Sequence, residues 1–298
     1  MRIILFLANQ ESLYQGQQRD EAMSAARAAG VQLDVSFAGG DAKRQREAVF
    51  GAIRSEKPPD GIVIHPIEEA GLKFVAQEAL RKGIVWATAG RESEWAAGLA
   101  REMGGVAFCV TPDQRGIGRL QGDQYRALLP GGGTVLYVTG PSMAGASSER
   151  QAGMEESRGS LLATIAVVGA WSEASGHDAV HGWLETTRGF VSFDLIGAQN
   201  DDMAVGALKA VRDASASLDK PEWRDLRAAG VDGMPQYGRR LVDDGTLAAT
   251  IVVPATAGKA VEQLAAVLRG GPRPPAVTMV PAVSYPDLGL LRSKSSTS

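Results

Sequence analysis

Short apolar runs alternate with helix-length amphipathic segments along almost the whole chain of 298 residues. Such alternation is typical of parallel β-α-β units, in which helices cover both faces of a sheet. The first series of runs predicts strands at residues 2–8, 31–37, 61–65, 84–88 and 106–110. A second series after Thr111 predicts strands at residues 134–138, 165–168, 194–198, 228–231 and 248–253. The pattern therefore predicts an α/β fold of two doubly wound, Rossmann-like lobes with parallel sheets.

The helices and the end of the chain follow from the same kind of pattern. Alanines at i, i+3, i+4 and i+7 between residues 22 and 29 predict a helix, and Gly30 is placed to end it in a left-handed cap. Pro254 opens another helix, which a Pro-rich turn separates from a last strand at residues 277–280. Residues 291–298 are mostly polar, and we expect a disordered tail there.

Composition excludes two classes of partner. The formal net charge is −3 and the 31 Lys and Arg are scattered along the chain, so we expect no nucleic-acid partner. Cys109 is the single cysteine and the chain has three histidines, none of them grouped at metal-ligand spacing. We therefore expect no metal and no internal disulfide.

Residues 1–8 contain one Arg and a short apolar run, which Asn9, Gln10 and Glu11 end before a signal or membrane segment would be complete. We interpret them as a first strand. Two locations stay open: periplasmic or extracytoplasmic if a secretion signal was removed, and cytoplasmic otherwise.

The sequence offers no catalytic motif. GIGRLQG at 116–122 lacks the glycine spacing of a dinucleotide site, and GPSMAGAS at 140–147 lacks the Lys-Ser/Thr of a phosphate loop. Asp201 and Asp202 are interpreted as charges in the first turn of a helix rather than an acid/base pair. We expect neither an enzyme nor a cofactor.

Four segments, in order, carry a resemblance to a known family. They are DGIVIHP at 60–66 with IVWATAGR at 84–91, TPDQRGIGRLQGDQ at 111–124, SSERQAGM at 147–154, and AQNDDMAVGAL at 198–208. GVDGMP at 230–235 and DGTLAATI at 244–251 follow in the expected order. The chain resembles the ribose-type sugar-binding proteins of the periplasmic-binding-protein/LacI superfamily, which are ABC-transporter substrate-binding proteins of the type I fold.

The resemblance implies two lobes joined by three crossovers near Val110, Val253 and Pro281. The first lobe would comprise residues 1–110 and 254–281, and the second would comprise residues 111–253 and 282–290. A small polar ligand would lie in the cleft between lobes, at the carboxyl ends of parallel strands, where open α/β sheets bind ligands. Hinge closure around that ligand would be the mechanism.

The resemblance also assigns roles to residues that follow strands. Arg91 and Arg150 match arginines that grip sugar hydroxyls, and Asp232 matches a carboxylate that accepts from them. Asn200 offers a donor and an acceptor, and Tyr14 matches an aromatic lying against a sugar ring. Four of them have an alternative: Arg91 and Arg150 as surface residues that end a strand or start a helix, Asp232 as a turn former, and Asn200 as a helix N-cap.

Other candidates carry less support. Ser12 and Gln15 flank Tyr14 in one loop, and Trp171 is a second-lobe aromatic that could face the ligand. Trp86 lies within a strand and is expected in the core. His65 ends a strand and is expected to be a packed histidine rather than a ligand contact or a base.

Three positions depart from the ribose binders. Their aspartate, aromatic and glutamine are replaced here by Gly90, Val231 and Val253. A mismatched buried hydrogen-bonding group costs about 1–3 kcal/mol, so ribose is disfavoured as the ligand. An anionic or deoxy sugar is one hypothesis.

We therefore predict a solute-binding protein that captures a sugar or related polar solute for uptake through an ABC permease. The alternative is the sensing domain of a LacI-type regulator or of a membrane signalling receptor, because both would respond to lobe closure. We expect the protein to be a monomer.

Overall fold

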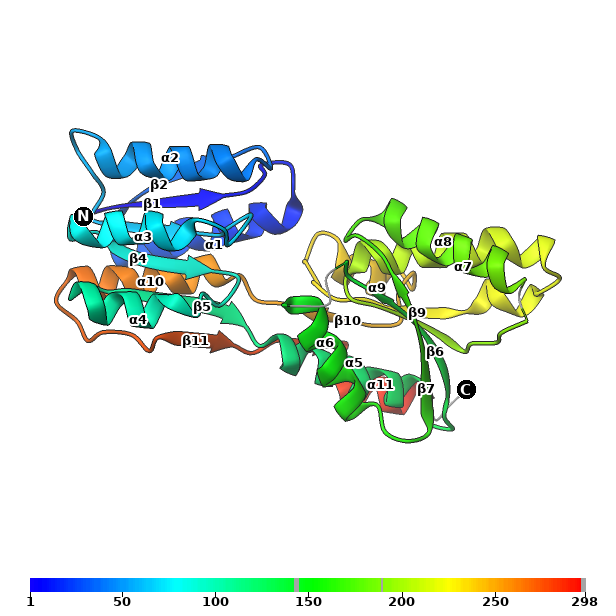
Figure 1. The fold of residues 1–298 in the computed structure, drawn as a ribbon. Coiled ribbons are helices and arrows are strands. Elements are labelled where there is room, and N and C mark those ends of the chain that lie inside the picture. Colours follow the sequence, from blue (N-terminus) through cyan, green and yellow to red (C-terminus); the bar gives the residue numbers. More distant parts are fainter. Residues whose placement is uncertain (142–144, 189, 296–298) are drawn as a thin grey trace. The chain divides into compact units, whose positions relative to one another are not determined.

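The apolar runs of the sequence form strands, and the chain that carries them divides into two units. The structure is a computed structural model that describes residues 1–141, 145–188 and 190–295. Unit 1 comprises Met1–Pro112 and Pro254–Val280, and unit 2 comprises Asp113–Val253 and Pro281–Ser298. The chain thus passes between the units three times, as Figure 1 lets the reader follow by colour.

Unit 1, which is described throughout, is built on one parallel sheet. Its strands are β1 (Arg2–Leu7), β2 (Gln32–Phe37), β3 (Gly61–Ile64), β4 (Val85–Ala89), β5 (Ala107–Pro112) and β11 (Val277–Val280). They lie in the order β11-β5-β4-β3-β1-β2. The edge strand β11 comes from the far end of the chain and pairs with β5.

Both faces of this sheet are covered, since its inner strands are mostly apolar and carry buried side chains on each side. In β1, Ile3 and Leu5 pack on one side and Ile4 and Phe6 on the other. The first side carries the helices α1 (Leu13–Ala29) and α10 (Thr256–Leu268). The second side carries α2 (Ala42–Arg54), α3 (Leu72–Arg81) and α4 (Trp95–Met103). As expected, α1 ends at Gly30 in the left-handed conformation, with a φ of 59°.

Unit 2 repeats the plan with one departure. Its parallel strands are β6 (Gly133–Thr139), β7 (Leu162–Val168), β8 (Leu195–Ala198) and β9 (Arg227–Ala229), in the order β7-β6-β8-β9. Isolated parallel bridges join the β9 region to β10 (Thr250–Val252). A strand that the sequence did not predict, β12 (Val283–Tyr285), then pairs antiparallel with β10.

The helices of unit 2 also form two layers. Leu136 and Val138 of β6 pack with α7 (Glu173–Thr187) and α8 (Asp201–Ser217). Val135 and Tyr137 of the same strand pack with α5 (Gln114–Leu128), α6 (Ala146–Ser157) and α11 (Leu288–Ser295). Shorter helices lie at η1 (Pro221–Asp225) and α9 (Gly238–Asp243). The predicted fold class, two doubly wound α/β lobes joined by three crossovers, is confirmed.

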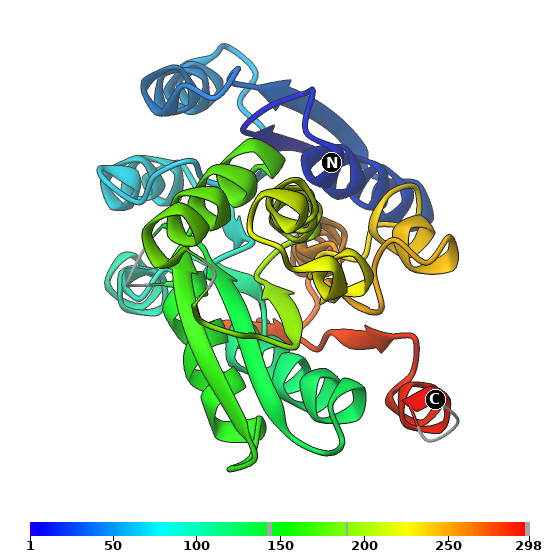
Figure 2. The same cartoon turned by 90° about the vertical axis from the view of Figure 1, so that its right-hand side faces the viewer.

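The expectation of a disordered tail at residues 291–298 is wrong for its first part. Residues 291–295 belong to α11, which follows β12 near the C-terminus (Figure 2). Leu291 is 3% exposed and packs in the core with Leu128 and Leu162. The apolar pair Leu288 and Leu291, three residues apart, gives the helix a face to bury. Residues 296–298 lie outside the described part of the chain.

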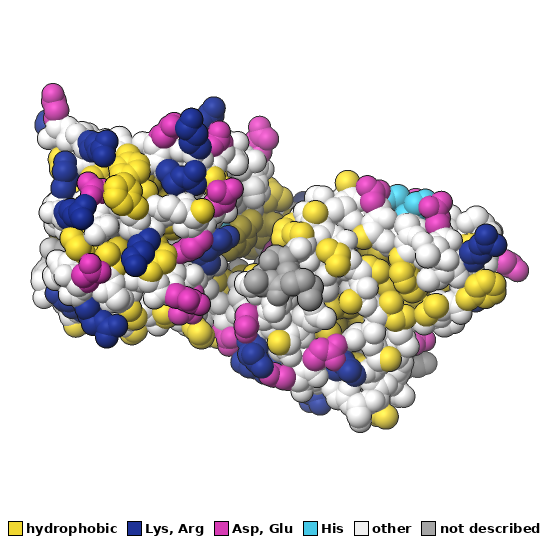
Figure 3. Space-filling model, viewed as in Figure 1, with side chains coloured by type: hydrophobic (Ala, Val, Ile, Leu, Met, Phe, Trp, Pro, Cys, Tyr) yellow, Lys and Arg dark blue, Asp and Glu magenta, His cyan; other side chains and the backbone are white. Residues whose placement is uncertain are grey.

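The surface gives no sign of a stripe of positive charge on the side shown in Figure 3. There the Lys and Arg side chains of unit 1 are interspersed with Asp and Glu. Some pair, as in Arg46 with Glu68 at 3.5 Å. Among the helices of the described chain, none combines the length and the apolar character needed to cross a membrane.

The burial of Leu291 predicts that α11 contributes to the stability of unit 2. Leu291→Ala should lower the free energy of unfolding by about 2–5 kcal/mol, because it leaves a cavity in the core. Leu290→Ala is the matched control, since the Leu290 side chain is 57% exposed. Chemical denaturation followed by circular dichroism measures both. Equal midpoints for the two variants would show that the helix does not hold the core.

Candidate ligand-binding site

The order of the strands singles out one end of each sheet, the end at which the parallel strands finish. In unit 1 the chain order reverses at β1, which lies between β2 and β3, and in unit 2 it reverses at β6, between β7 and β8. Open parallel sheets bind ligands outside the carboxyl ends of strands at such a point. The candidate residues follow strands at this end: Ser12, Tyr14 and Gln15 after β1, Arg91 after β4, Trp171 after β7, Asn200 after β8, and Asp232 after β9.

In unit 1, two candidates hold the loop after β1 in place. The Ser12 hydroxyl caps α1 by accepting from the backbone N–H of Gln15 at 3.4 Å. The Gln15 side chain is 6% exposed, and its Oε1 accepts from the N–H of Ala8 at 3.1 Å. Its Nε2 lies 3.3 Å from Nδ1 of His65. The principal polar groups of Ser12 and Gln15 are therefore engaged by the protein itself.

Tyr14 and Arg91 are the two other candidates of unit 1. The Tyr14 ring meets the His65 ring edge to face, with centroids 5.7 Å apart and planes at 74°. Arg91 is exposed, and it makes no hydrogen bond or ion pair with the described residues. An exposed cation and a half-buried aromatic thus both lie near His65.

His65 lies at the same end of the sheet, a position near the other candidates that the sequence did not indicate. It follows β3 at the switch point, and burial together with the positive charge of Arg91 lowers the pKa of His65 to about 4. The imidazole is therefore neutral at physiological pH. The expectation of a packed histidine holds. The ring packs among Tyr14, Gln15 and Gly90 at the carboxyl ends of the strands.

In unit 2, Arg150 lies on α6 and is 6% exposed. Its Nε–H donates to Oε1 of Gln114 at 2.8 Å, and its Nη1 donates to the carbonyl oxygen of Gln199. The guanidinium carbon lies 5.8 Å from the centre of the Trp171 ring, within cation–π range. The alternative of a surface arginine is therefore wrong.

Close contact between two helices places Arg150. A Cβ on Gly118 of α5 would lie 2.0 Å from the Arg150 carbonyl oxygen, and a Cβ on Gly153 of α6 would lie 2.0 Å from that of Arg115. Both positions therefore require glycine. The glycines in the segment after Thr111 and in SSERQAGM therefore allow the two helices to pack closely.

A buried network behind Arg150 fixes its main acceptor. The Gln199 side chain accepts from the N–H of Gly140 at 2.9 Å, and it donates to the Tyr137 hydroxyl at 3.0 Å and the Ser147 carbonyl at 2.9 Å. Gln199 is fully buried. Sequence reasoning did not single out Gln199, although a polar residue closing an apolar strand was a usable sign.

Asn200 and Trp171 are linked to each other. Asn200 caps α8 by accepting from the N–H of Met203 at 2.9 Å, as the N-cap alternative predicted, and its Nδ2 donates to the carbonyl of Trp171 at 3.0 Å. Trp171 has a φ of 64°, a left-handed conformation that is uncommon for a bulky residue. Its ring lies where a Cβ on Gly140 would be, 2.0 Å from Cζ2. Strain of this kind persists where surroundings enforce it, often at ligand sites.

Asp232 follows β9 with a φ of 106°. Burial raises the pKa of Asp232 to about 7, although the charge of Arg150 acts to lower it. No side-chain hydrogen bond joins its carboxyl group to the part of the chain that the structure describes. Near neutral pH this group exists in both protonation states.

The interpretation of Asp201 as a helix-end charge needs correction. Asp201 does lie in the first turn of α8, but it is 1% exposed. Its carboxylate accepts from the Thr250 hydroxyl at 2.6 Å and from the N–H of Gly233 at 2.9 Å. Burial raises the pKa of Asp201 well above its usual range. Asp201 therefore anchors the loop that carries Asp232.

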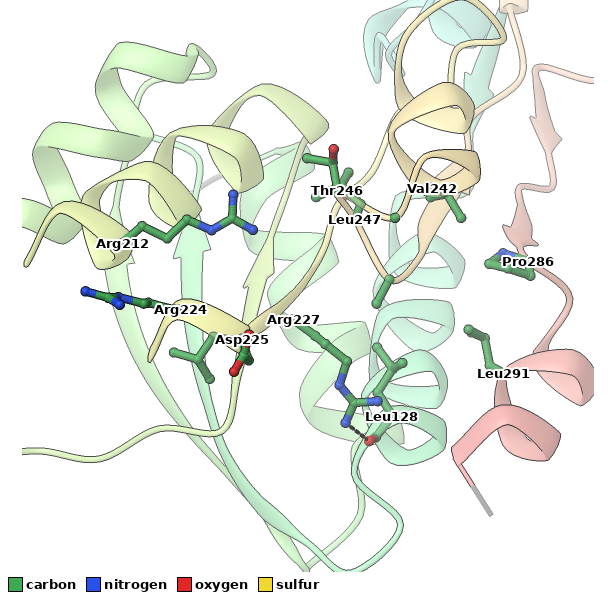
Figure 4. A pocket seen from close by; sticks show the side chains of 13 residues that line it. Leu128, Arg212, Arg224, Asp225, Arg227, Val242, Thr246, Leu247, Pro286 and Leu291 are labelled. Carbon is green, nitrogen blue, oxygen red and sulfur yellow. Dashed lines mark hydrogen bonds between the residues drawn. The ribbon is translucent and has the colours of Figure 1, made fainter. Parts of the chain in front are cut away.

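A pocket of about 460 Å³ in unit 2 contains none of the candidate residues. It lies at the other end of the strands, where Arg227 begins β9 and its Nη2 donates to the Leu128 carbonyl at 2.6 Å (Figure 4). The remaining lining includes Arg212 and Leu291. Within the described chain, no group of three or more His, Cys, Asp or Glu is arranged to hold a metal ion.

Both α/β units carry polar side chains at the carboxyl ends of their strands, where open parallel sheets bind ligands. A family model described as a periplasmic binding protein domain matches residues 3–272. The chain therefore belongs to the periplasmic-binding-protein family, whose members bind solutes rather than transform them.

Known proteins agree with this assignment. The chain is 23% identical over 281 residues to the galactofuranose-binding protein YtfQ of Escherichia coli (strain K12), covering 92% of this chain and 84% of that protein. It is 30% identical over 173 residues to the ribose import binding protein RbsB of the same organism, covering 56% and 54%. A solute-binding protein of Actinobacillus succinogenes with bound D-allose shares the fold at a TM-score of 0.81, with 20% identity, over 100% of this chain and 99% of that one.

The contact between α5 and α6 makes a prediction about Gly153. Gly153→Ala should destabilise the protein by about 1–3 kcal/mol, because the new Cβ overpacks the helix interface. Gly98→Ala in α4 is the control: nothing lies within 4 Å of its Cβ position, so it should be neutral or stabilise by up to about 1 kcal/mol. Thermal unfolding measures both. A Gly153 variant as stable as the control would refute the close contact.

Proposed function

We propose that this protein captures a monosaccharide or a monosaccharide derivative and presents it to an ABC permease. The proposal rests chiefly on one observation: Arg150 is held beside Trp171 at the end of the sheet from which Asn200 and Asp232 also extend. An aromatic, a guanidinium, an amide and a carboxyl group together suit a small ring that carries hydroxyls.

Each group has a distinct role in this proposal. Arg150 donates from the guanidinium nitrogen that the protein leaves least engaged, and Asn200 adds its second amide N–H. Asp232 accepts from a sugar hydroxyl when ionised. Trp171 lies against an apolar face of the ring, where burial of area favours binding. Ser12 and Gln15 support the loop instead of contacting the sugar.

Unit 1 contributes Tyr14 and Arg91 to the same ligand. A solute contacted by both units binds better to a closed arrangement than to an open one, and therefore shifts the population toward closure. Closure is then the state that a permease recognises. We place the protein in the periplasm and infer that it acts as a monomer, on the strength of its family and of relatives such as the ribose import binding protein.

Isothermal calorimetry against a panel of D-ribose, D-allose, D-galactose, L-arabinose and D-galacturonate tests the function. At least one member should bind with a micromolar or lower Kd. If D-ribose is the tightest ligand, the argument from Gly90, Val231 and Val253 is wrong. If none binds and no sugar is found by mass spectrometry of the purified protein, the proposed function falls.

Arg150 should be essential for affinity. Arg150→Met keeps the length of the side chain but removes its donors, and it should weaken binding more than tenfold for whichever sugar of the panel binds best. Arg212→Ala, an exposed arginine of the same unit, is the control and should leave affinity unchanged. Circular dichroism verifies that each variant is folded. Unchanged affinity in folded Arg150→Met would exclude this residue from the site.

The raised pKa of Asp232 predicts that binding depends on pH. Because the pKa is about 7, the acceptor is mostly protonated at pH 6 and mostly ionised at pH 8. Affinity should therefore rise by about tenfold between these values and level off above them. Asp232→Asn should bind more weakly and lose the dependence. An affinity that stays flat, or that rises toward pH 6, would show that Asp232 does not accept from the sugar.

A further inference from the structure

The hydrogen bonds of Gln15 fix the tautomer of His65. Because Oε1 of Gln15 accepts from the Ala8 N–H at 3.1 Å, the amide nitrogen is the atom that faces His65. That nitrogen donates to Nδ1 of the imidazole at 3.3 Å. With Nδ1 as the acceptor, a neutral His65 carries its proton on Nε2.

Nε2 of His65 faces Gly90. A Cβ at position 90 would lie 2.3 Å from Nε2, nearer than to any other atom of the ring, so the N–H points to the place that a side chain would take. The φ of Gly90 is 86°, which also favours glycine. His65 and a side chain at position 90 are therefore mutually exclusive.

Two donors at the carboxyl ends of these strands, His65 and Arg91, have no acceptor among the described residues. Nε2 of His65 is buried and has no hydrogen-bond partner among the described residues. Arg91, next to Gly90, is exposed and has no ion pair with an acid among the described residues. A buried donor without an acceptor costs free energy. The charge of Arg91 also disfavours protonation of the His65 imidazole, so the imidazole stays neutral.

We propose that the solute is a sugar acid, whose carboxylate is received by the guanidinium of Arg91 and by the Nε2–H of His65. The proposal rests on the proposed function and narrows it to one chemical class. A carboxylate accepts from several donors at once and compensates the arginine. A rotation of the imidazole away from Gly90, which exchanges the contact with Gln15 for one with the ligand, brings Nε2–H to the carboxylate. His65 thus determines specificity by donating and by excluding any acidic side chain at position 90.

Matched pairs of sugars test the proposal by calorimetry: D-galacturonate with D-galactose, D-glucuronate with D-glucose, and D-ribonate with D-ribose. At least one acid should bind tenfold or more tightly than its neutral counterpart. If a neutral sugar binds and no acid binds tenfold more tightly than its neutral counterpart, the inference fails while the proposed function stands. If no member of any pair binds, both fail.

A double variant tests the mechanism with the acid that binds best. His65→Ala combined with Gly90→Asp removes the donor and sets a carboxylate beside Arg91, so affinity for the acid should fall at least tenfold more than affinity for its neutral counterpart. Gly90→Asp alone would clash with the imidazole and is not informative. Arg101→Ala, an exposed arginine of α4, should change neither affinity. Equal loss for acid and neutral sugar would show a merely structural role for His65.

Nitrogen NMR adds a readout that does not depend on affinity. With three histidines in the chain, His65→Gln assigns the signals of His65. At pH 7 the imidazole should be neutral with its proton on Nε2, and the Nε2 signal should shift when saturating D-galacturonate, or the acid that the calorimetry identifies, is added. A proton on Nδ1, or an unchanged Nε2 signal at saturation, would overturn the assignment.

Discussion

The burial of the Arg150 guanidinium constrains much of unit 2. A buried cation is costly unless its donors are satisfied, and Arg150 meets that condition in part, through Gln114 and the carbonyl of Gln199. That carbonyl has a fixed position because the side chain of Gln199 is tied to Gly140, Tyr137 and Ser147. The helix that carries Arg150 can come close enough only where glycines remove the side chains between α5 and α6. Helix packing, strand ends and the buried network therefore depend on one another.

The two units prepare their arginines differently. Arg150 is immobilised before any solute arrives, so little side-chain entropy remains to be lost on binding. Arg91 is exposed and unpaired within the described chain, and its neighbour Gly90 faces the imidazole of His65. Arg150 of unit 2 is thus held by hydrogen bonds within the protein, whereas Arg91 of unit 1 is an exposed cation near a buried imidazole.

Local patterns in the sequence predicted what depends on local physics. Apolar alternation located the parallel strands, and the short-range rules for helix ends identified Gly30 and Asn200. The glycines of α5 were noticed as part of a motif, but their purpose is a contact with α6, some thirty residues away, that spacing alone does not reveal. The same limit applies to Asp201, whose partners Gly233 and Thr250 come from other segments. For His65 the sequence suggested packing correctly, yet its tautomer follows from a glutamine fifty residues earlier.

The last part of the chain also determines when either unit can be completed. Unit 1 needs α10 to cover one face of its sheet and β11 to finish the edge, although both are made after unit 2 is almost entirely synthesised. Unit 2 in turn needs β12 and Leu291 of α11. When the ribosome has produced about 250 residues, the clusters on one face of each sheet have all their buried residues, whereas the opposite faces still lack α10 or Leu291. Holding such a chain soluble until its end emerges is a demand on the cell that the order of segments, rather than the stability of the folded state, imposes.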